Sequence, residues 1–255
     1  MNLDKELIIN DLDKIFPLPE GIGSLRVLDK ISLQLDRGEI IAILGPSGCG
    51  KSTLLNILAG FEKPNKGEVY FKGTPVTKPT SQIGMVFQSA VLFPWLTVKG
   101  NIAYGLRFKK YKDKEIDTIC QQHIHLVGLE GFEKYYPNQL SGGMQQRTAL
   151  ARILALEPKV LLMDEPFASL DAQSRITMQQ LLLSIWSQIQ PTIIFVTHDV
   201  EEALVLADNV YIMSKLPGRI THKIKVPLGR PRPISVIGTA EFSKIKGDIL
   251  TLLFS

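Results

Sequence analysis

The sequence predicts an α/β protein built on a mainly parallel sheet. Apolar runs at residues 39–44, 160–164 and 192–197 have the length and composition of strands that are buried on both faces. The first of them leads into a glycine-rich turn and then into a helix over 52–59, which is a strand–turn–helix unit. The chain has 255 residues, 45% of them hydrophobic, which is enough for one sizeable core and an inserted subdomain.

The flanking segments predict further strands and helices around this core. Residues 7–12 and 31–35 are expected to be strands, and a loop containing residues 16–21 is expected between them. The second strand alternates apolar and polar residues as a half-buried antiparallel strand does. Short strands are also expected at 67–71, 83–87 and 209–214. Helices are expected at 98–108, 112–127, 172–189, 200–207 and 241–254, and the last of these is amphipathic.

Composition and charge exclude several classes of function. No apolar run approaches the roughly 18 residues of a membrane-spanning helix, and the polar start at residues 1–6 lacks the pattern of a signal peptide. Cys49 and Cys120 are the two cysteines, and they provide neither a disulfide framework nor a metal-binding spacing. A net charge of +4 is not a nucleic-acid-binding composition, so no nucleic acid partner is expected. Any membrane association must therefore come through a partner.

The positive charge is concentrated near the end of the chain. Residues 209–240 contain six basic side chains and no acidic one, whereas the rest of the chain has a small negative balance. One interpretation is a solvated face, and the other is contact with lipid headgroups or a protein partner.

Residues 45–53 match the phosphate-binding loop pattern G-x-x-x-x-G-K-[ST]. The glycines let backbone N–H groups turn inward around a phosphate, where a side chain would block the approach. Lys51 can reach the terminal phosphates, and the Ser52 hydroxyl is placed to ligate the Mg²⁺ that bridges them. A glycine-rich turn that binds nothing is the alternative, but the complete pattern between a strand and a helix favours nucleotide binding. The predicted loop consists of Gly45, Pro46, Ser47, Gly48, Cys49, Gly50, Lys51, Ser52 and Thr53.

A second anion site is predicted at the start of the helix that follows Leu140. Ser141 is a natural N-cap, and Gly142 and Gly143 leave the first N–H groups of a helix running to Leu156 open to an anion. This stretch lies far along the chain from the phosphate loop. One nucleotide held by both would most simply bridge two chains.

Two carboxylates end the apolar run at 160–164. Asp164 is expected at the C-terminal edge of the sheet, where it can hold the Mg²⁺ shell. Glu165 can accept a proton from an attacking water. Together with the phosphate loop, the pair predicts hydrolysis of a nucleoside triphosphate.

Three other features each have two interpretations. Phe16 is the only aromatic residue before the phosphate loop, so it either stacks on an adenine base or belongs to the core. The segment 93–98, which contains Trp95, is either core or a docking patch for another protein. His198 follows the third apolar run and either binds a phosphate oxygen or a water, or caps the next helix.

The order of these motifs resembles that of the ATP-binding subunit of an ABC (ATP-binding cassette) transporter over essentially the whole chain. The phosphate loop is followed by Gln88, LSGGMQQR at 140–147, VLLMDEP at 160–166, SLD at 169–171 and His198. LSGGMQQR is the most specific of these motifs, because other phosphate-loop enzymes lack it.

The resemblance implies the ABC ATPase fold, a phosphate-loop NTPase core with a mainly parallel sheet, an N-terminal antiparallel β-subdomain and an inserted helical subdomain. Residues 1–255 would form one such domain. Within it, 1–88 and 157–255 would be the nucleotide-binding core with the β-subdomain, and 89–156 the helical signature subdomain.

The resemblance also implies roles for single residues toward ATP and Mg²⁺. Phe16 would stack on adenine, while the phosphate loop would hold the phosphates and the metal ion. Gln88 would contact the metal and the water and report to the membrane subunit. Asp164 would serve the metal, Glu165 would be the catalytic base, and His198 would be the γ-phosphate switch.

Other roles concern a second subunit in an ATP-bound homodimer. Ser141, Gly142, Gly143 and Gln145 would cap the γ-phosphate of the nucleotide bound by the other subunit, and Asp171 would communicate across the dimer. Ser169 departs from the pattern, in which alanine is more usual, but the departure is small and bears little on the role of Asp171.

Two further stretches are similar to the nitrate, sulfonate and taurine branch of importers, namely FQSAVLFPWLT at 87–97 and LPGRITHKIKVPLGRPRP at 216–233. They imply an importer with integral membrane permease subunits docked near 88–97 and with an extracytoplasmic solute-binding protein. The chain would then lie at the cytoplasmic face of the inner membrane.

Other classes of phosphate-loop protein fit less well. A non-transport ABC ATPase of the DNA-repair kind needs a long coiled-coil insertion, and one of the translation kind usually carries two cassettes, neither of which fits in 255 residues. A small-molecule phosphotransferase needs an acceptor pocket and has no use for the LSGGMQQR motif.

Overall fold

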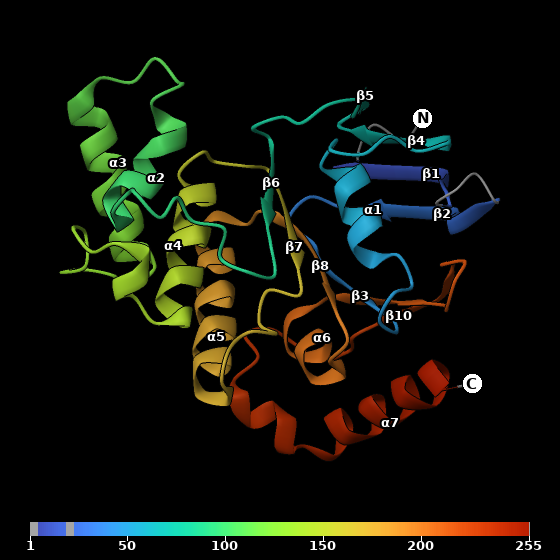
Figure 1. The fold of residues 1–255 in the computed structure, drawn as a ribbon. Coiled ribbons are helices and arrows are strands. Elements are labelled where there is room, and N and C mark those ends of the chain that lie inside the picture. The colour runs from blue at the N-terminus through green and yellow to red at the C-terminus, as the bar shows by residue number, and fades with distance from the viewer. Residues whose placement is uncertain (1–4, 19–22, 255) are drawn as a thin grey trace. The chain divides into compact units, whose positions relative to one another are not determined.

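The computed structural model describes residues 5–18 and 23–254, which form two compact units (Figure 1). The first unit comprises Met1–Thr80 and Pro191–Ser255, and the second comprises Ser81–Gln190. Residues 1–4 of the predicted polar start and residues 19–21 of the loop expected after Phe16 lie outside the described part. Within that part, no helix is both long and apolar enough to cross a membrane.

A four-stranded antiparallel sheet in the first unit has the order β2-β1-β4-β5. β1 (Leu7–Pro17) lies between β2 (Ser24–Leu35) and β4 (Lys66–Phe71), and β5 (Thr74–Pro75) pairs with β4. The alternation expected at 31–35 is confirmed, because every second residue there is buried. The predicted loop around Phe16 is wrong at its start, since Phe16 and Pro17 pair with β2 and extend β1.

The same unit contains a parallel ladder centred on β3 (Ile40–Leu44), all of whose residues are buried. β8 (Thr192–Thr197) and β9 (Asn209–Met213) pair in parallel with β3 on either side. The apolar run at 192–197 predicts such a buried strand, and at 209–214 a strand was expected without a direction. β10 (Ile220–Lys225) is antiparallel to β9 and was not predicted, because its exposed, polar sequence has no apolar run or alternation. This ladder positions the loop that leads from β3 into α1 (Lys51–Leu58).

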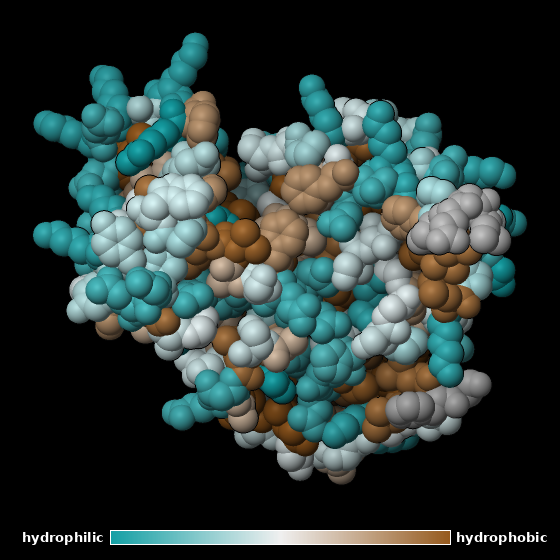
Figure 2. All heavy atoms as spheres, in the orientation of Figure 1, coloured by the Kyte–Doolittle hydropathy of each residue, from teal (hydrophilic) through white to brown (hydrophobic). Residues whose placement is uncertain are grey.

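Two helices and a short 3-10 turn complete the first unit. α6 (Val200–Leu206) contacts β3 and β8, and α7 (Ala240–Phe254) packs on α6 and on η3 (Ile234–Gly238). Phe242 and Ile249 of α7 are buried, which confirms the amphipathic prediction. Figure 2 shows hydrophobic side chains on the side of α7 that lies toward α6.

The basic strip at 209–240 is largely engaged within its own unit. Arg219 Nε donates to Asp29 at 2.6 Å, and Arg230 Nε donates to Asp208 at 2.8 Å. Arg232 is 6% exposed and donates to backbone carbonyls, including that of Leu204 at 2.8 Å. Burial lowers the pKa of Arg232 to about 10. Three of the six basic residues are therefore bonded within the unit, although Arg219 remains exposed and only Arg232 is buried. Neither interpretation of the strip anticipated these internal partners.

The second unit contains two parallel strands and a group of helices. β6 (Ile83–Val86) pairs with β7 (Val160–Asp164). α2 (Val98–Leu106), α3 (Asp113–Leu126) and α4 (Gly142–Leu154) pack on one another, as Figure 1 shows. α4 also contacts β6 and α5 (Ala172–Ile189), and η2 (Pro137–Gln139) precedes α4. The predicted helical subdomain at 89–156 lies within this unit.

Candidate functional site

The phosphate loop begins at the buried end of β3. Leu44 pairs with Thr197 of β8 and with Ile212 of β9, so the strand that delivers the loop is held on both sides. Gly45 is fully enclosed, because a Cβ there would lie 2.9 Å from both Cys49 Sγ and the Met213 carbonyl oxygen. The start of the loop therefore admits only glycine without a shift of its neighbours.

Two glycines give the loop its turn. Gly48 and Gly50 have φ values of +77° and +103°, in the left-handed region that favours glycine. At Gly48 a Cβ would meet no atom of the described residues within 4 Å, so the conformation alone sets the requirement there. Gly50 is the N-cap of α1, and its Cβ would lie 2.9 Å from side-chain atoms of Val27 and Leu28. The side chains of β2 thus support the loop from behind.

Lys51 and Ser52 lie at the start of α1 with different exposure. Lys51 is 5% exposed, and its ammonium group donates to the carbonyl oxygens of Gly45 at 2.9 Å and Pro46 at 3.0 Å. Ser52 is exposed, as are Ser47 and Gly48 on the outer side of the loop. A buried lysine behind exposed backbone and hydroxyl groups is the arrangement that a phosphate cradle requires.

Cys49 takes part in the loop through its backbone. Its side chain is 1% exposed, and burial raises the pKa of the thiol, although the Lys51 charge opposes the rise. The thiol is therefore neutral and inward-facing. The sequence predicts Cys49 to be one of the nucleotide-binding residues. Because its side chain faces inward, only its main chain could contact a nucleotide.

Phe16 lies near the end of β1 and is half-buried. The ammonium group of Lys14 lies 4.6 Å from the centroid of its ring, and Lys14 also bonds Glu62 at 2.6 Å. The ring is thus neither a core residue nor a fully exposed one.

His198 directly follows β8 and is exposed between two anchored residues. Thr197 donates from Oγ1 to Glu202 at 2.6 Å and accepts from the backbone N–H of Asp199 at 3.0 Å. Asp199 is the N-cap of α6 and accepts from the N–H of Glu201 at 2.7 Å. Capping is thus performed by Asp199, and the capping interpretation of His198 is wrong.

In the second unit, parallel strands bring Gln88, Asp164 and Glu165 to one edge. Val86 at the end of β6 pairs with Met163 of β7, so the segments after both strands leave the ladder together. Gln88 is exposed, and Asp164 and Glu165 are half-buried. Glu165 has φ +43°, a left-handed conformation that non-glycine residues rarely adopt. Such local strain is typical of functional positions.

The donors expected to bind Mg²⁺ are Ser52, Gln88 and Asp164. They offer hydroxyl, carboxamide and carboxylate oxygens, which are the hard ligands that Mg²⁺ prefers, and Mg²⁺ takes its remaining ligands from water and phosphate. The residue types fit the ion. The described residues contain no cluster of three or more His, Cys, Asp or Glu side chains placed to hold a metal.

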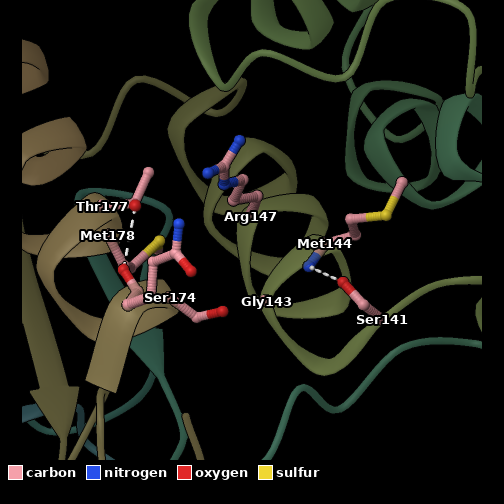
Figure 3. Close-up of a pocket in the computed structure, with 8 residues that line it drawn as sticks. Ser141, Gly143, Met144, Arg147, Ser174, Thr177 and Met178 are labelled. Carbon is pink, nitrogen blue, oxygen red and sulfur yellow. Dashed lines mark hydrogen bonds between the residues drawn. The ribbon is translucent and has the colours of Figure 1, made fainter. Parts of the chain in front are cut away.

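The predicted second anion site lies at the N-terminus of α4. Ser141 is the N-cap and accepts a hydrogen bond from the backbone N–H of Met144 at 3.3 Å. Gly143 faces Ser174 at the start of α5, and a Cβ on the glycine would lie 3.7 Å from the serine side chain (Figure 3). The two helix starts enclose a pocket of about 220 Å³, which is lined by Ser141, Gly143, Met144, Arg147, Gln173, Ser174, Thr177 and Met178.

Gln145 and Asp171 bind the backbone of their own segments. Gln145 Nε2 donates to the carbonyls of Pro137 at 2.9 Å and Leu140 at 3.2 Å, which fixes the turn before α4. Asp171 is the N-cap of α5 and accepts from the N–H groups of Gln173 and Ser174 at 3.0 Å each. The hydrogen bonds from Ser174 lower the pKa of Asp171, so this carboxyl is ionised at neutral pH.

Sequence reasoning missed two groups of residues near these sites. Gly218 lies against the phosphate loop, since its N–H donates to the Val27 carbonyl at 2.9 Å and a Cβ there would collide with the Cys49 carbonyl. Gln146 and Asn101 are buried amides. Gln146 binds carbonyls far along the chain, such as that of Pro166, and Asn101 binds carbonyls of the loop just before its own helix, such as that of Leu96. An amide inside an otherwise apolar helix face is the signal that could have identified them.

The fold and the loop geometry define the chain as a phosphate-loop nucleotide-binding protein. The profile of the ABC transporter family matches residues 28–168. The chain therefore belongs to the ABC transporter family, and within it the chain is an ATP-binding cassette, the subunit that hydrolyses ATP.

Similar proteins and structures agree with this family. The aliphatic sulfonates import ATP-binding protein SsuB of Bacillus cereus (strain ZK / E33L) is 46% identical over 95% of this chain and 93% of that protein. The taurine import ATP-binding protein TauB of Pelagibacter ubique (strain HTCC1062) is 43% identical over 98% of this chain and 96% of that protein. A dimeric post-hydrolysis structure of an ATP-binding cassette bound to ADP and Pi has a TM-score of 0.76 at 31% identity, covering 88% of this chain and 100% of that one.

Proposed function

We propose that this chain hydrolyses ATP to power the import of a solute of the nitrate, sulfonate and taurine class. One observation supports the ATPase activity. The same chain contains a glycine-rich phosphate loop with a buried lysine and an LSGGMQQR helix that is capped by a serine. The import part is supported by the relatives named SsuB and TauB, which match nearly the full length of the chain.

In this proposal the first unit holds the nucleotide. Lys51 neutralises the terminal phosphates, and the N–H groups of the loop bind their oxygens. The half-buried ring of Phe16 stacks on adenine, and the Lys14 ammonium group, which is paired with Glu62, lies beside the ring. Ser52, Gln88 and Asp164 hold Mg²⁺, which supplies charge neutralisation at the phosphates.

Hydrolysis requires a base and a group that senses the γ-phosphate. Glu165 is proposed as the base that accepts a proton from the attacking water, and its strained backbone supports a fixed aim for the carboxylate. His198 is proposed to bind the γ-phosphate, since its exposed side chain follows a residue anchored by Glu202. Gln88 is proposed to orient the water and to signal its presence.

The complete site is proposed to form between two copies of the chain. Ser141, Gly142 and Gly143 of one copy would close over the γ-phosphate held by the phosphate loop of the other, with Gln145 keeping the turn before α4 in place. Two-fold symmetry then gives two equivalent sites in one isologous interface. Asp171, ionised and exposed, would lie at this interface and carry signals across it. Hydrolysis removes the shared phosphate and loosens the dimer.

A surface of aromatic side chains is proposed to dock the permease, and it consists of Phe93, Trp95, Tyr104 and Phe108. Neighbouring ring centroids lie 4.3–5.6 Å apart, and Trp95 and Phe108 are 69% and 79% exposed. On the face in Figure 2, hydrophobic and near-neutral side chains lie over the segment between β6 and α2, and hydrophilic ones project from the far end of the α2–α3 pair.

Asn101 pre-organises this docking surface. The side chain is fully buried, and its Oδ1 accepts from the N–H of Phe93 at 2.9 Å while Nδ2 donates to the carbonyls of Leu96 and Thr97 at 3.0 Å each. These bonds hold the loop that presents Trp95 in one conformation.

The proposed importer has two further components, the permease and a solute-binding protein outside the membrane. The chain itself would lie at the cytoplasmic face of the membrane.

The proposal is tested by Lys51→Ala, with Lys66→Ala as a control because Lys66 is an exposed lysine of the same unit. A triphosphate without its buried counter-charge loses a charge-assisted contact worth about 1.5–3 kcal/mol. ATP turnover, measured by phosphate release, is expected to be lost in Lys51→Ala and kept in Lys66→Ala. Unchanged turnover in Lys51→Ala would remove the central assignment.

A further inference from the structure

Gln146 is a buried glutamine in α4 whose side chain connects this helix to two other segments of the second unit. Its side chain is 1% exposed and comes from α4, the helix that Ser141 caps. Its Nε2 group donates to the carbonyl oxygen of Phe87 at 3.3 Å and to that of Pro166 at 3.2 Å. Phe87 directly precedes Gln88, and Pro166 directly follows Glu165. One amide thus binds the neighbours of two proposed site residues.

The position of this amide matters because the backbone ladder ends just before it. The last pair between β6 and β7 is Val86 with Met163, and beyond it the two segments are no longer paired as strands. Gln146 cross-links the segments at this point, with one N–H for each carbonyl. The two carbonyl oxygens belong to separate segments and are buried, so each of them needs a hydrogen-bond donor. The glutamine amide group supplies both donors from one nitrogen.

The Glu165 turn depends on such an anchor. Glu165 has φ +43°, and its carbonyl accepts from the N–H of Ala168 at 3.1 Å in a tight turn. A strained conformation persists only where its surroundings fix it. Pro166 has no backbone N–H, so its carbonyl oxygen is the one hydrogen-bonding group of its main chain. Through this oxygen, which accepts from Gln146, the turn is bonded to α4.

We propose that Gln146 is a positioning residue for ATP hydrolysis, which fixes Gln88 and Glu165 to each other and to the helix that begins at Ser141. The proposal rests on the proposed roles of those residues. It adds a physical connection between them, because a movement of α4 is transmitted through one side chain to both segments.

The experiment compares Gln146→Leu with Thr148→Val in the full-length chain. Thr148 is a matched control because it is fully buried on the same helix and its hydroxyl donates only within α4, to the Met144 carbonyl at 2.8 Å. Single-turnover hydrolysis of ATP is expected to slow by about 10²-fold in Gln146→Leu, the effect of a small misplacement of reacting groups. ATP affinity, measured by equilibrium dialysis, should stay within about twofold of the unmodified chain in both variants, since the phosphate loop is untouched.

A double-mutant cycle separates positioning from a general loss of stability. If Gln146 acts by aiming Glu165, then adding Gln146→Leu to Glu165→Gln should slow the residual hydrolysis far less than it slows the unmodified chain. An equal slowing in both backgrounds would overturn the proposal, as would normal hydrolysis in Gln146→Leu. Gln146→Met keeps the length of the side chain and removes both donors without adding a buried charge, so it tests the same point if the leucine variant does not fold.

Hydrogen exchange of the backbone gives a result that does not depend on ATP turnover. Faster exchange around residues 87–89 and 165–168 is expected in the Gln146 variants and not in Thr148→Val. If the unmodified chain hydrolyses no ATP, the proposed function fails while this measurement still decides the anchoring role. Exchange that is unchanged in those segments would overturn the anchor even if hydrolysis were slowed.

Discussion

At the scale of single residues, the phosphate loop depends on how completely its neighbours enclose it. Gly45 and Gly50 have no room for a side chain, because Met213, Cys49, Val27 and Leu28 already occupy the space. Lys51 is held by two carbonyls of its own loop, so its ammonium group is buried before any ligand is considered. The loop is therefore a rigid element whose geometry is set by the fold.

Phe16 tests the adenine-binding part of the proposal. Phe16→Ala is expected to weaken ATP binding by about 1–3 kcal/mol, by analogy with base–aromatic stacking. GTP should be tolerated to some degree, because stacking reads no base-specific hydrogen bonds. Phe61→Ala, which truncates an exposed phenylalanine of the same unit, is the control. Normal ATP affinity in Phe16→Ala, measured by fluorescence titration, would contradict the stacking role.

The sequence predicts single residues well where a motif fixes the backbone around them. The glycines of the loop, the Ser141 cap and the Asp164–Glu165 pair all lie where the patterns place them, at strand ends and helix starts. Gln146 and Asn101 could not be predicted in this way. Their partners are backbone carbonyls of other segments, and a sequence does not identify which carbonyl a buried amide meets.

At the scale of elements, strands were predictable in proportion to their burial. β3, β7 and β8 are almost entirely buried and have sequences that are apolar throughout. β10 has mostly exposed residues and was missed, although its hairpin with β9 positions Gly218 against the phosphate loop. The start of the loop after β1 was also misplaced, because pairing with β2 overrides the loop-forming sequence around Pro17.

The loop between β6 and α2 gives a prediction for assembly with the permease. Trp95→Ala should leave the ATPase activity of the isolated chain unchanged and impair assembly or solute uptake in cells, because it truncates the most exposed part of the Phe93–Trp95 pair. Ile189→Ala removes an exposed apolar side chain of α5 as a control. Co-purification with the permease is the measurement, and a Trp95→Ala variant that assembles and transports normally would exclude this docking surface.

At the scale of the whole molecule, the two units carry different parts of the proposed chemistry. The first contains the phosphate loop, Phe16 and His198, and the second contains Gln88, the carboxylate pair and the α4 N-terminus. The solute is a separate matter, because no residue of an ATP-hydrolysing subunit needs to contact it.

The proposed dimer brings together the two anion sites of separate copies. Glu165→Gln is the variant in which the ATP-bound dimer should accumulate. The substitution keeps the shape of the side chain and removes the base, which should slow hydrolysis by roughly 10²–10⁴-fold. ATP would then remain between two copies and hold them together. Ser141→Arg is the companion change, because it places a bulky cation at the start of α4 and should return the variant to monomer.

Light scattering after size-exclusion chromatography of Glu165→Gln, with and without ATP, tests the central claim most directly. The account predicts a dimer with saturating ATP, a monomer without it, and a monomer in both conditions when Ser141→Arg is added. A Glu165→Gln chain that stays monomeric at saturating ATP, even with the permease present, would contradict the shared site.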